Sequence, residues 1–454
     1  MSDSSSLSRD ENGIGAGATR RRRFVYAIAA SGVSKLLAFA VQLLALPLAL
    51  HSLGTDRYTS FLALQSFLSW TGLFGFGLSY ALPKYISAAF VAGDRAEERH
   101  LVGSSLILIS AASGVLMAVL LLLGLVVSPA TLVAAASSIS YDELRTAYFV
   151  AVVVNTVQLI ASVDPTIRSG YQEFHWSSVA SLAAWALVLV GLLLASQHPV
   201  TISTFIVVIY APIALTFLVD IALLFRQRPH LRRGGVDFRA TVAKIAMPSG
   251  NAIAYQIQFG LVMYLPVLIM AHLTNPSQTA IFGSVLQLVV LGVSSLNLVL
   301  QPLTSAMANA HSHNDVGWIR RSHAKMLWFI IPVGAAGVVL AAAVGPFLIR
   351  HWLGAAMQVS RELLAGFGVC LVLMALVQLE FFSLSAMGAL RSAGFAALVA
   401  GLAGVVLGAV LCVGSGAMGM VIGMAAGLAA SAAALFVSVR REMSRMESGP
   451  VAPV

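Results

Sequence analysis

Two lysines lie inside long apolar stretches of the sequence, where a charged side chain is costly. Lys35 lies about eleven residues into the stretch 24–50, roughly 16 Å along a helix that rises 1.5 Å per residue. Lys84 follows Pro83 in the stretch 58–88. A charge deep in a bilayer costs about 2.5–3.5 kcal/mol and usually faces a cavity or a partner. We therefore expect both lysines to line a cationic cavity that attracts phosphate or pyrophosphate; alternatively, their ammonium groups reach the inner membrane surface.

Three acidic residues, Glu380, Asp220 and Asp164, lie toward the ends of other apolar stretches. Carboxylates at such places can bind a coupling ion, H⁺ or Na⁺, or can form structural ion pairs between helices. Glu380 can pair with one of the two lysines. Asp220 and Asp164 have arginines near them in the sequence, which favours ion pairing for both.

Two arginines occupy equivalent positions in two similar segments. The tripeptide Val-Gln-Leu at 157–159 precedes Arg168-Ser169-Gly170, and the same tripeptide at 377–379 precedes Arg391-Ser392. At the inner mouth of a cavity, Arg168 and Arg391 can bind an anionic substrate. The alternative is that both arginines anchor the topology of the chain at the inner membrane surface.

No motif predicts a catalytic, metal or cofactor site. His311 and His313 lie in a loop without carboxylates around them, and Cys370 and Cys412 both fall inside apolar stretches. The glycines at 72, 75 and 77 have the spacing of close helix packing and are not followed by Gly-Lys-Ser, so they form no phosphate-binding loop. We expect no catalytic residues, no metal and no cofactor, and therefore no enzyme.

The composition shows which elements must position these residues. Of 454 residues, 59% are hydrophobic and 10% are charged, and the mean hydropathy is +0.89. Soluble domains are about 45–50% apolar and about 25% charged, so a soluble enzyme and a disordered chain are excluded. A membrane-spanning helix needs about 20 apolar residues. Twelve stretches meet that length: 24–50, 58–88, 101–127, 145–164, 177–195, 202–225, 245–272, 279–308, 326–349, 363–387, 394–412 and 417–439.

The basic residues gather in alternate loops between these stretches. Most of the 27 Lys and Arg residues share one side of the membrane, and the other side holds only Arg57, Arg145, Arg350 and Arg361. Since cytoplasmic loops carry the excess of Lys and Arg, this pattern predicts that both termini are cytoplasmic. The net charge of +9 therefore indicates topology and not nucleic-acid binding.

The chain also contains an internal duplication. Pro47 and Pro83 in the first half have counterparts in Pro266 and Pro302 at similar spacing. We therefore predict an all-α, polytopic membrane protein with two six-helix lobes, related as parallel repeats around a central cavity. Such lobes favour a transporter that works by alternating access. The predicted parts are a basic tail 1–23, a first lobe 24–225, a basic linker 226–244, a second lobe 245–439 and a tail 440–454.

Several short segments resemble the Wzx-like polysaccharide-export flippases of the multidrug/oligosaccharidyl-lipid/polysaccharide exporter (MOP) superfamily. They are Gly32 to Lys35, Leu46-Pro47-Leu48, Leu53-Gly54-Thr55 with Tyr58, Gly75-Phe76-Gly77-Leu78, Lys84-Tyr85-Ile86, Gly93-Asp94 and the stretch from Ile167 to Phe174. The resemblance covers most of the chain in topology, and its motifs are concentrated in residues 30–100 and 164–176.

This resemblance implies a transporter that flips an undecaprenyl-pyrophosphate-linked oligosaccharide across the inner membrane for surface polysaccharide (O-antigen, capsule or exopolysaccharide). It also implies that polysaccharide assembly proteins in the membrane are partners. One alternative is a cation-coupled multidrug antiporter of the same superfamily, which predicts acidic residues in the first lobe. A further alternative is a membrane polysaccharide polymerase or glycosyltransferase, but the longest outer loop, 128–144, is short for a catalytic segment.

Overall fold

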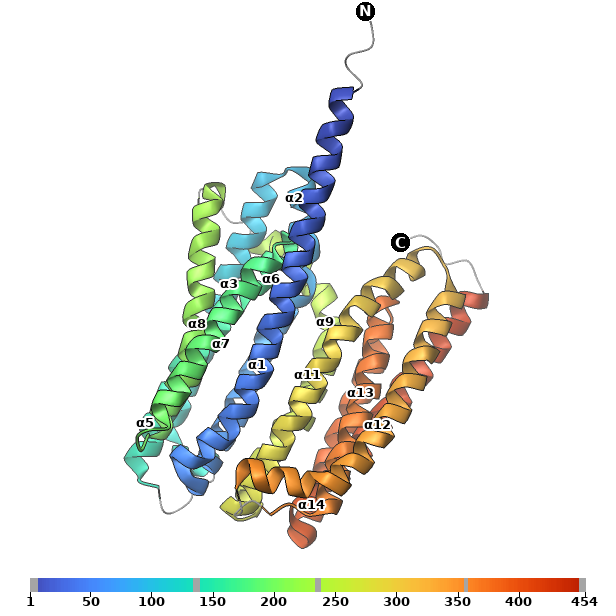
Figure 1. Cartoon of the computed structure of the whole chain (residues 1–454). Helices are drawn as coiled ribbons and strands as arrows, with labels where there is room; N and C mark the ends of the chain where they lie inside the picture. Colours follow the sequence, from blue (N-terminus) through green and yellow to red (C-terminus); the bar gives the residue numbers. More distant parts are fainter. Residues whose placement is uncertain (1–6, 134–138, 233–237, 355–357, 449–454) are drawn as a thin grey trace, which may run out of the picture.

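The computed structural model describes residues 7–133, 139–232, 238–354 and 358–448. Within these ranges it leaves out the side chains of 7–32, 73–81, 133, 174, 238, 240, 242, 244–252, 298, 301, 305 and 391–392. The secondary structure of the described residues is helical throughout, and Figure 1 shows the helices running in two groups along a common direction.

The first group of helices comes from the first half of the chain: α1 (Leu7–Ser69), η1 (Trp70–Gly72), α2 (Leu73–Ala92), α3 (Arg95–Val126), α4 (Pro129–Val133), α5 (Tyr141–Ala161), α6 (Val163–Gly170), α7 (Phe174–Ala195), α8 (Ile202–Gln227) and η2 (Pro229–Arg232). Gly54, with φ of 72°, interrupts α1 and reverses the chain between two helices. A left-handed φ of this kind favours glycine, since a Cβ would be strained there.

The second group comes from the second half: α9 (Phe238–Met263), α10 (Leu265–Leu273), α11 (Pro276–Ser312), α12 (Val316–Leu353), α13 (Arg361–Ala386) and α14 (Leu390–Ser448). Gly416, with φ of 56°, divides α14 into two antiparallel helices. These two helices approach so closely that a Cβ on Gly423 would lie 2.2 Å from the Cα of Gly408. Small residues on facing sides allow this backbone contact.

The helix boundaries follow the predicted membrane spans. Among the described residues, ten helices are long and apolar enough to cross a membrane, and two of them, Val33–Gly72 and Ala393–Ser448, contain the turns at Gly54 and Gly416. Helix starts at predicted loops carry side-chain caps, in which an oxygen accepts a hydrogen bond from an orphan backbone N–H. The capping residues include Asp94, Ser140, Thr201, Asn275, Asp315 and Ser360.

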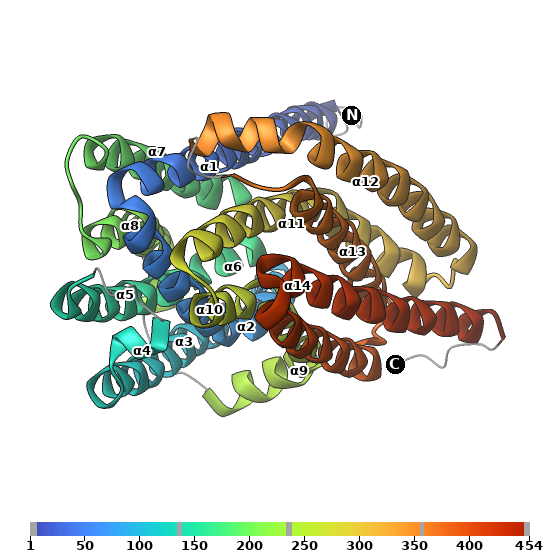
Figure 2. The ribbon, with the colours of Figure 1, turned by 90° about the horizontal axis from the view of Figure 1, so that it is seen from below.

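The two groups form lobes, and α1, α10 and α11 bring them together at the end away from the termini. In Figure 1, α1 and α11 lie close together at the lower end and diverge toward the end that carries the N- and C-termini. The view along the helices in Figure 2 places α10 and α11 beside the helices of the first lobe. Packing of α1 against α10 and α11, and of α2 against α9, joins the lobes.

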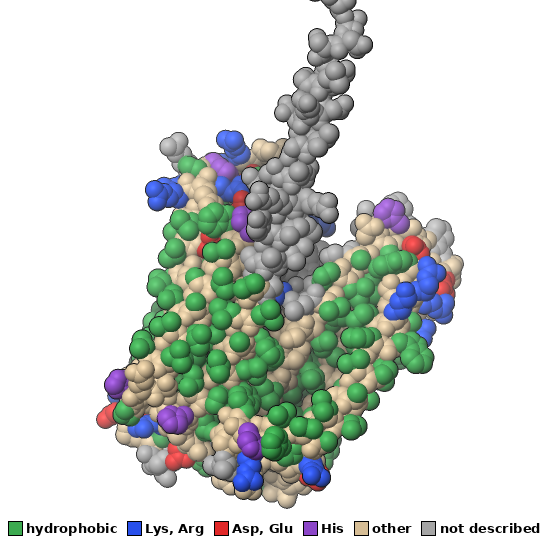
Figure 3. All heavy atoms as spheres, in the orientation of Figure 1, with side chains coloured by type: hydrophobic (Ala, Val, Ile, Leu, Met, Phe, Trp, Pro, Cys, Tyr) green, Lys and Arg blue, Asp and Glu red, His purple; other side chains and the backbone are tan. Residues whose placement is uncertain are grey.

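The outer flanks of the lobes are apolar. Figure 3 shows hydrophobic side chains covering the sides of the molecule, whereas Lys, Arg, Asp and Glu gather toward the two ends. On α12, Trp328 is 80% exposed and Phe329 is 56% exposed. Exposed apolar area of this extent is stable only in lipid, so the described flanks form the belt of a multi-pass membrane protein.

Candidate functional site

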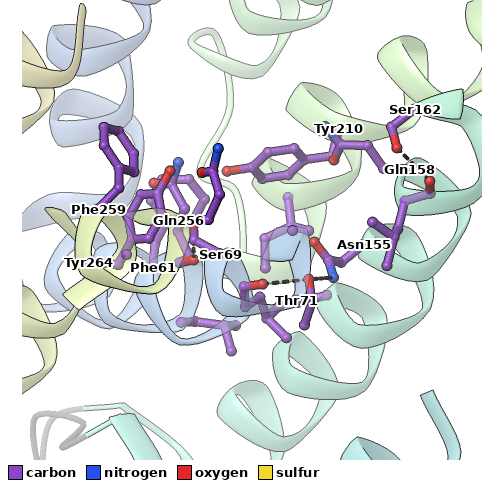
Figure 4. Close-up of a pocket in the computed structure, with 18 residues that line it drawn as sticks. Phe61, Ser69, Thr71, Asn155, Gln158, Ser162, Tyr210, Gln256, Phe259 and Tyr264 are labelled. Carbon is purple, nitrogen blue, oxygen red and sulfur yellow. Dashed lines mark hydrogen bonds between the residues drawn. The ribbon is translucent and has the colours of Figure 1, made fainter. Parts of the chain in front are cut away.

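A cavity of about 370 Å³ lies between the lobes. The residues that line it come from α1, η1, α5, α8, α9 and the junction before α10. They are Phe61, Leu64, Gln65, Leu68, Ser69, Thr71, Gly72, Ala151, Asn155, Gln158, Leu159, Ser162, Ile206, Tyr210, Gln256, Phe259, Gly260 and Tyr264. Figure 4 shows Phe259 and Tyr264 of the second lobe on one side and Asn155, Gln158 and Ser162 of the first lobe on the other.

The cavity lining combines apolar side chains with polar side chains that carry no charge. Its hydrogen-bonding groups are mainly amides and hydroxyls, and its apolar surface includes the aromatic rings of Phe61 and Phe259. The amide of Asn155 donates a 2.7 Å hydrogen bond to Thr71 Oγ1, which fixes one edge of the site. Amides and hydroxyls can pair with neutral hydroxyl or carbonyl groups, and aromatic rings can pack against the flat face of an organic ring.

Three breaks in the helices face this cavity. The chain leaves α1 for the 3₁₀ turn Trp70–Gly72, leaves α5 for α6 at Ser162, and leaves α9 for α10 at Tyr264. At two of the breaks the i to i−4 hydrogen bond is kept, since the N–H groups of Ser162 and Tyr264 donate to the carbonyls of Gln158 and Gly260 at 2.9 Å. In membrane proteins such irregular backbone is tolerated where it lines a cavity, as it does here.

The lobes close the cavity on the side away from the termini. Tyr58 and Ser284, both buried, share a 3.0 Å hydrogen bond between α1 and α11. Further hydrogen bonds between described residues of the two lobes join Thr59 to the carbonyl of Pro276 (2.8 Å), Gln287 to Gln65 (3.3 Å) and His272 to the carbonyl of Thr131 (2.9 Å). Gly283 permits this approach, because a Cβ there would lie 2.7 Å from Leu62 Cδ1.

Arg168 is not on the cavity wall but inside the first lobe. Its side chain is fully buried, and all five of its N–H donors are engaged. Nε and Nη2 donate to the two carboxylate oxygens of Asp220 at 3.2 and 2.6 Å, and Nη2 also donates to the Asp220 carbonyl. Nη1 donates to Glu173 and Gln227 at 2.8 and 3.1 Å. No donor of Arg168 is therefore left for a substrate.

The other predicted cations are not among the cavity residues. Lys35 on α1 and Lys84 on α2 are both exposed, and neither lines the cavity. The side chain of Arg391, near the start of α14, lies outside the described residues. The described residues that line the cavity between the lobes are all uncharged, so the expected cationic wall is not found at this place.

Glu380 pairs with a histidine and not with a lysine. Its carboxylate lies 2.9 Å from Nε2 of His323, and both side chains are buried between α13 and α12. The ring of His323 lies beside Phe436 of α14, whose other neighbour is the guanidinium of Arg440. The predicted pairing of Glu380 with Lys35 or Lys84 is wrong, since the lysines are in the other lobe. Among the described residues there is no cluster of His, Cys, Asp and Glu that could hold a metal ion.

The amides of the cavity were not predicted as site residues. Gln65, Asn155, Gln158 and Gln256 are uncharged, and the search for chemistry in the sequence weighed charges first. Their signal is nonetheless present, because an amide inside an apolar stretch also needs a hydrogen-bonding partner. Gln158 belongs to the duplicated Val-Gln-Leu tripeptide. Its counterpart Gln378 lies buried inside the second lobe.

Solved structures of transporters share the fold of this chain. One is a multidrug resistance MATE family transporter of the MOP superfamily in an inward-facing conformation, with a TM-score of 0.74 and 16% identity over 91% of this chain and 96% of the other. A mutant of the Vibrio cholerae MATE transporter VcmN gives a TM-score of 0.63 and 12% identity over 93% and 98% of the two chains. The chain has the fold of a MOP-superfamily transporter. The predicted all-α fold with two six-helix lobes is thereby confirmed.

The MOP fold is shared over nearly the whole chain at low sequence identity. A third neighbour is a MOP superfamily transporter from Pyrococcus furiosus, with a TM-score of 0.65 and 15% identity over 93% of this chain and 96% of the other. The reversed polarity of that protein's binding pocket is said to suggest a different function for it. No family model matches the chain, and no curated protein matches it in sequence. The resemblance to Wzx-like flippases thus extends to the superfamily fold and not to that subfamily.

Proposed function

We propose that this chain is an exporter, and not an enzyme, that moves an organic solute through the cavity between its lobes by alternating access. The observation that carries this proposal is a central, polar cavity that both lobes line and that their contacts close at one end. The lining offers hydrogen bonds and aromatic surface but no nucleophile paired with a base. Such a site binds and releases a molecule without chemical change.

The described conformation supports an inward-facing state. The lobes touch beyond the cavity at Tyr58 and Ser284 and diverge toward the end that carries the termini (Figure 1). If the basic loops mark the cytoplasm, that diverging end is the cytoplasmic one in a bacterial inner membrane. The similarity to a neighbour whose conformation is inward-facing supports the same assignment.

Ion-coupled multidrug export is the first candidate function. The structural neighbours are named as MATE and multidrug resistance transporters, which favours this alternative over lipid flipping. The cavity wall lacks the acidic residues that a purely cationic drug would need. We therefore infer a preference for neutral or weakly charged aromatic solutes, with H⁺ or Na⁺ as the coupling ion.

Flipping of a lipid-linked oligosaccharide is the second candidate, and the amide-rich lining favours it. Gln65, Asn155, Gln158 and Gln256 supply the paired donors and acceptors that sugar hydroxyls require, and aromatic rings can stack on a sugar face. In this case the exposed Lys35 and Lys84 are proposed contacts for the pyrophosphate, together with Arg391. Polysaccharide assembly proteins in the membrane would then be partners.

Two parallel assays test the proposal. Purified protein is reconstituted in proteoliposomes, and transport is followed for a panel of neutral and cationic fluorescent dyes and for a fluorescent undecaprenyl-pyrophosphate oligosaccharide. Exporter function predicts uptake or translocation of at least one class above empty liposomes. Dye transport that Lys35→Ala leaves intact supports the first candidate, and oligosaccharide translocation that Lys35→Ala abolishes supports the second. Absence of transport in both assays, with folded protein, contradicts the proposal.

A further inference from the structure

A buried charge network at the inner end of the first lobe contains an excess of acid. Arg168 binds Asp220 and Glu173, and Glu173 also accepts a 2.7 Å hydrogen bond from Arg228. These two guanidinium groups and two carboxylates balance one another. The carboxylate of Asp164 on α6 is the third acid of the group, and among the described residues the cation that acts on it is Arg168.

Asp164 has no hydrogen-bonding partner in this network. The residue is 0% exposed, and neither of its carboxylate oxygens receives a hydrogen bond. Its charged neighbours are Asp220 and Arg168, and the five donors of Arg168 are already engaged elsewhere. An ionised Asp164 would therefore be a buried charge without a partner, which costs several kcal/mol.

Among the described residues, the charged groups that act on Asp164 are Asp220 and Arg168. Asp220, on α8, repels an ionised Asp164, and Glu173, before α7, is shared by Arg168 and Arg228. Lys84 on α2 is exposed. Glu98 on α3 accepts a hydrogen bond from Tyr171 and lies 3.3 Å from His230 Nε2. Burial, followed by the charge of Glu98, raises the pKa of the Tyr171 phenol, which therefore remains a donor.

We propose that Asp164 is a proton-binding residue, whose carboxyl group is protonated in the described conformation and directs its O–H to the Asp220 carboxylate. One proton removes the uncompensated charge and supplies the missing hydrogen-bond donor at the same time. Two carboxylates that face one another in a buried site share a proton for this reason. Release of the proton to water leaves Asp164 ionised and requires that the site open to solvent.

The position of Asp164 connects this proton to the cavity. Ser162, two residues earlier, lies at the break between α5 and α6 and lines the cavity. A change in the charge of Asp164 therefore acts on the same helix junction that contacts the solute. This role in coupling rests on the proposed transporter function, whereas the protonated carboxyl itself does not.

Infrared spectroscopy of the purified protein in lipid tests the proposal without a substrate. A protonated buried carboxyl group gives a C=O stretching band, separate from that of carboxylates, which shifts when H₂O is replaced by D₂O. We expect this band in the wild-type protein at neutral pH and its loss in Asp164→Asn, whose amide is similar in shape to the protonated acid. The control Asp142→Asn changes an exposed acid at the outer start of α5 and should keep the band.

Two outcomes would overturn the proposal: a wild-type protein without the band at neutral pH, or a band that Asp164→Asn leaves unchanged. If Asp164→Asn does not fold, titration of the wild-type band decides, since the band must disappear as pH rises through the pKa of a single buried group. A band with the expected behaviour in a protein that transports nothing would support the proton site and refute only the exporter. Transport by a protein that lacks the band would support the exporter and refute the proton site.

Discussion

Amide side chains provide much of the hydrogen-bonding capacity of the central cavity. Gln256 projects from α9 of the second lobe, opposite the amides of α5 in the first lobe. A solute held between the lobes must exchange its hydrogen bonds with water for bonds to these groups, and each such bond contributes about 0.5–1.5 kcal/mol net.

Replacement of Gln256 by leucine should therefore weaken transport without unfolding the protein. We expect the apparent affinity for the transported solute to fall about 3- to 10-fold, as the loss of one hydrogen bond implies. Concentration dependence of transport in proteoliposomes measures this effect. Gln358→Leu, the same exchange in an exposed loop, is the control. Equal affinity in Gln256→Leu and the control would remove Gln256 from the binding site.

Arg168 should act on stability and not on substrate affinity. Arg168→Gln leaves Asp220 and Glu173 without their buried partner, and breaking a buried ion pair costs about 3–5 kcal/mol. We expect a much lower melting temperature and less protein in the membrane, whereas Arg232→Gln at an exposed position changes little. Melting curves in detergent measure the difference. A stable Arg168→Gln protein that fails only to bind substrate would support the original sequence prediction for this arginine.

Sequence reasoning at the scale of residues found the charged groups but not their partners. The clustering of Arg168 with Asp220 and Asp164 depends on how α6 and α8 pack, which hydropathy does not encode. Glu380 was expected near a lysine, and its partner is His323, a residue that the sequence presents only as one histidine near a loop. Uncharged amides gave the weakest sequence signal, although four of them line the cavity.

At the scale of elements, the contact between α1 and α11 closes the cavity on the side away from the termini. Tyr58→Phe removes its hydrogen bond to Ser284 and should reduce the population that is closed on this side by about fivefold, as a loss of about 1 kcal/mol implies. Double electron–electron resonance can measure the distance between spin labels at Asp142→Cys and Glu362→Cys, at the starts of α5 and α13. This distance reports the population that is closed on the side away from the termini.

Tyr148→Phe is a matched control for that measurement. It also removes a buried phenol, but its hydrogen bond goes to the Leu120 carbonyl within the first lobe. We therefore expect some loss of stability and no shift of the interlobe distance. An equal shift in both variants would show that the Tyr58 contact does not hold the lobes together.

The close crossing of the two helices of α14 should be sensitive to a single methyl group. A Cβ on Gly423 would lie 2.2 Å from the Cα of Gly408, so one helix must move aside. We expect Gly423→Ala to lower the melting temperature clearly. Gly414→Ala, where a Cβ meets nothing within 4 Å, should be neutral or slightly stabilising because alanine favours helix. Similar melting temperatures for the two variants would contradict this packing.

Hydropathy predicted the helices well because each span must satisfy its backbone internally and face lipid. The predicted stretch 202–225 corresponds to Ile202–Gln227, and 363–387 to Arg361–Ala386. The breaks at Ser162 and Tyr264 were not predicted, since hydropathy continues through both. Pro165 and Pro266 follow these breaks by a few residues and are the signal that identifies them in retrospect.

At the scale of the whole molecule, the duplicated prolines occupy matching places. Pro47 lies within the last helical turns before Gly54, and Pro266 lies in α10 shortly before the loop at Thr274. The two-lobe architecture was therefore predictable from spacing alone. The conformation was not, because composition is the same whether the lobes open inward or outward. The boundaries of the lobes and of the linker 226–244 stay predictions.

A disulfide across the contact between α1 and α11 tests alternating access most directly. A Cβ on Gly283 would lie 3.8 Å from the Cβ of Leu62, which is the usual separation in a disulfide. A disulfide between Leu62→Cys and Gly283→Cys therefore links the two lobes covalently on this side. The matched control is Gly366→Cys with Val421→Cys, whose Cβ separation is also 3.8 Å but which lies within the second lobe.

Transport is measured in proteoliposomes for the solute that the earlier assays identify, before and after reduction of the disulfide. Cys370 and Cys412 are replaced by alanine in both double-cysteine variants. We predict that the disulfide between the lobes stops transport and that a reducing agent restores it. The control disulfide within the second lobe should leave transport unchanged. Undiminished transport by a protein whose interlobe disulfide is fully formed would contradict movement of the solute by alternate opening of the two lobes.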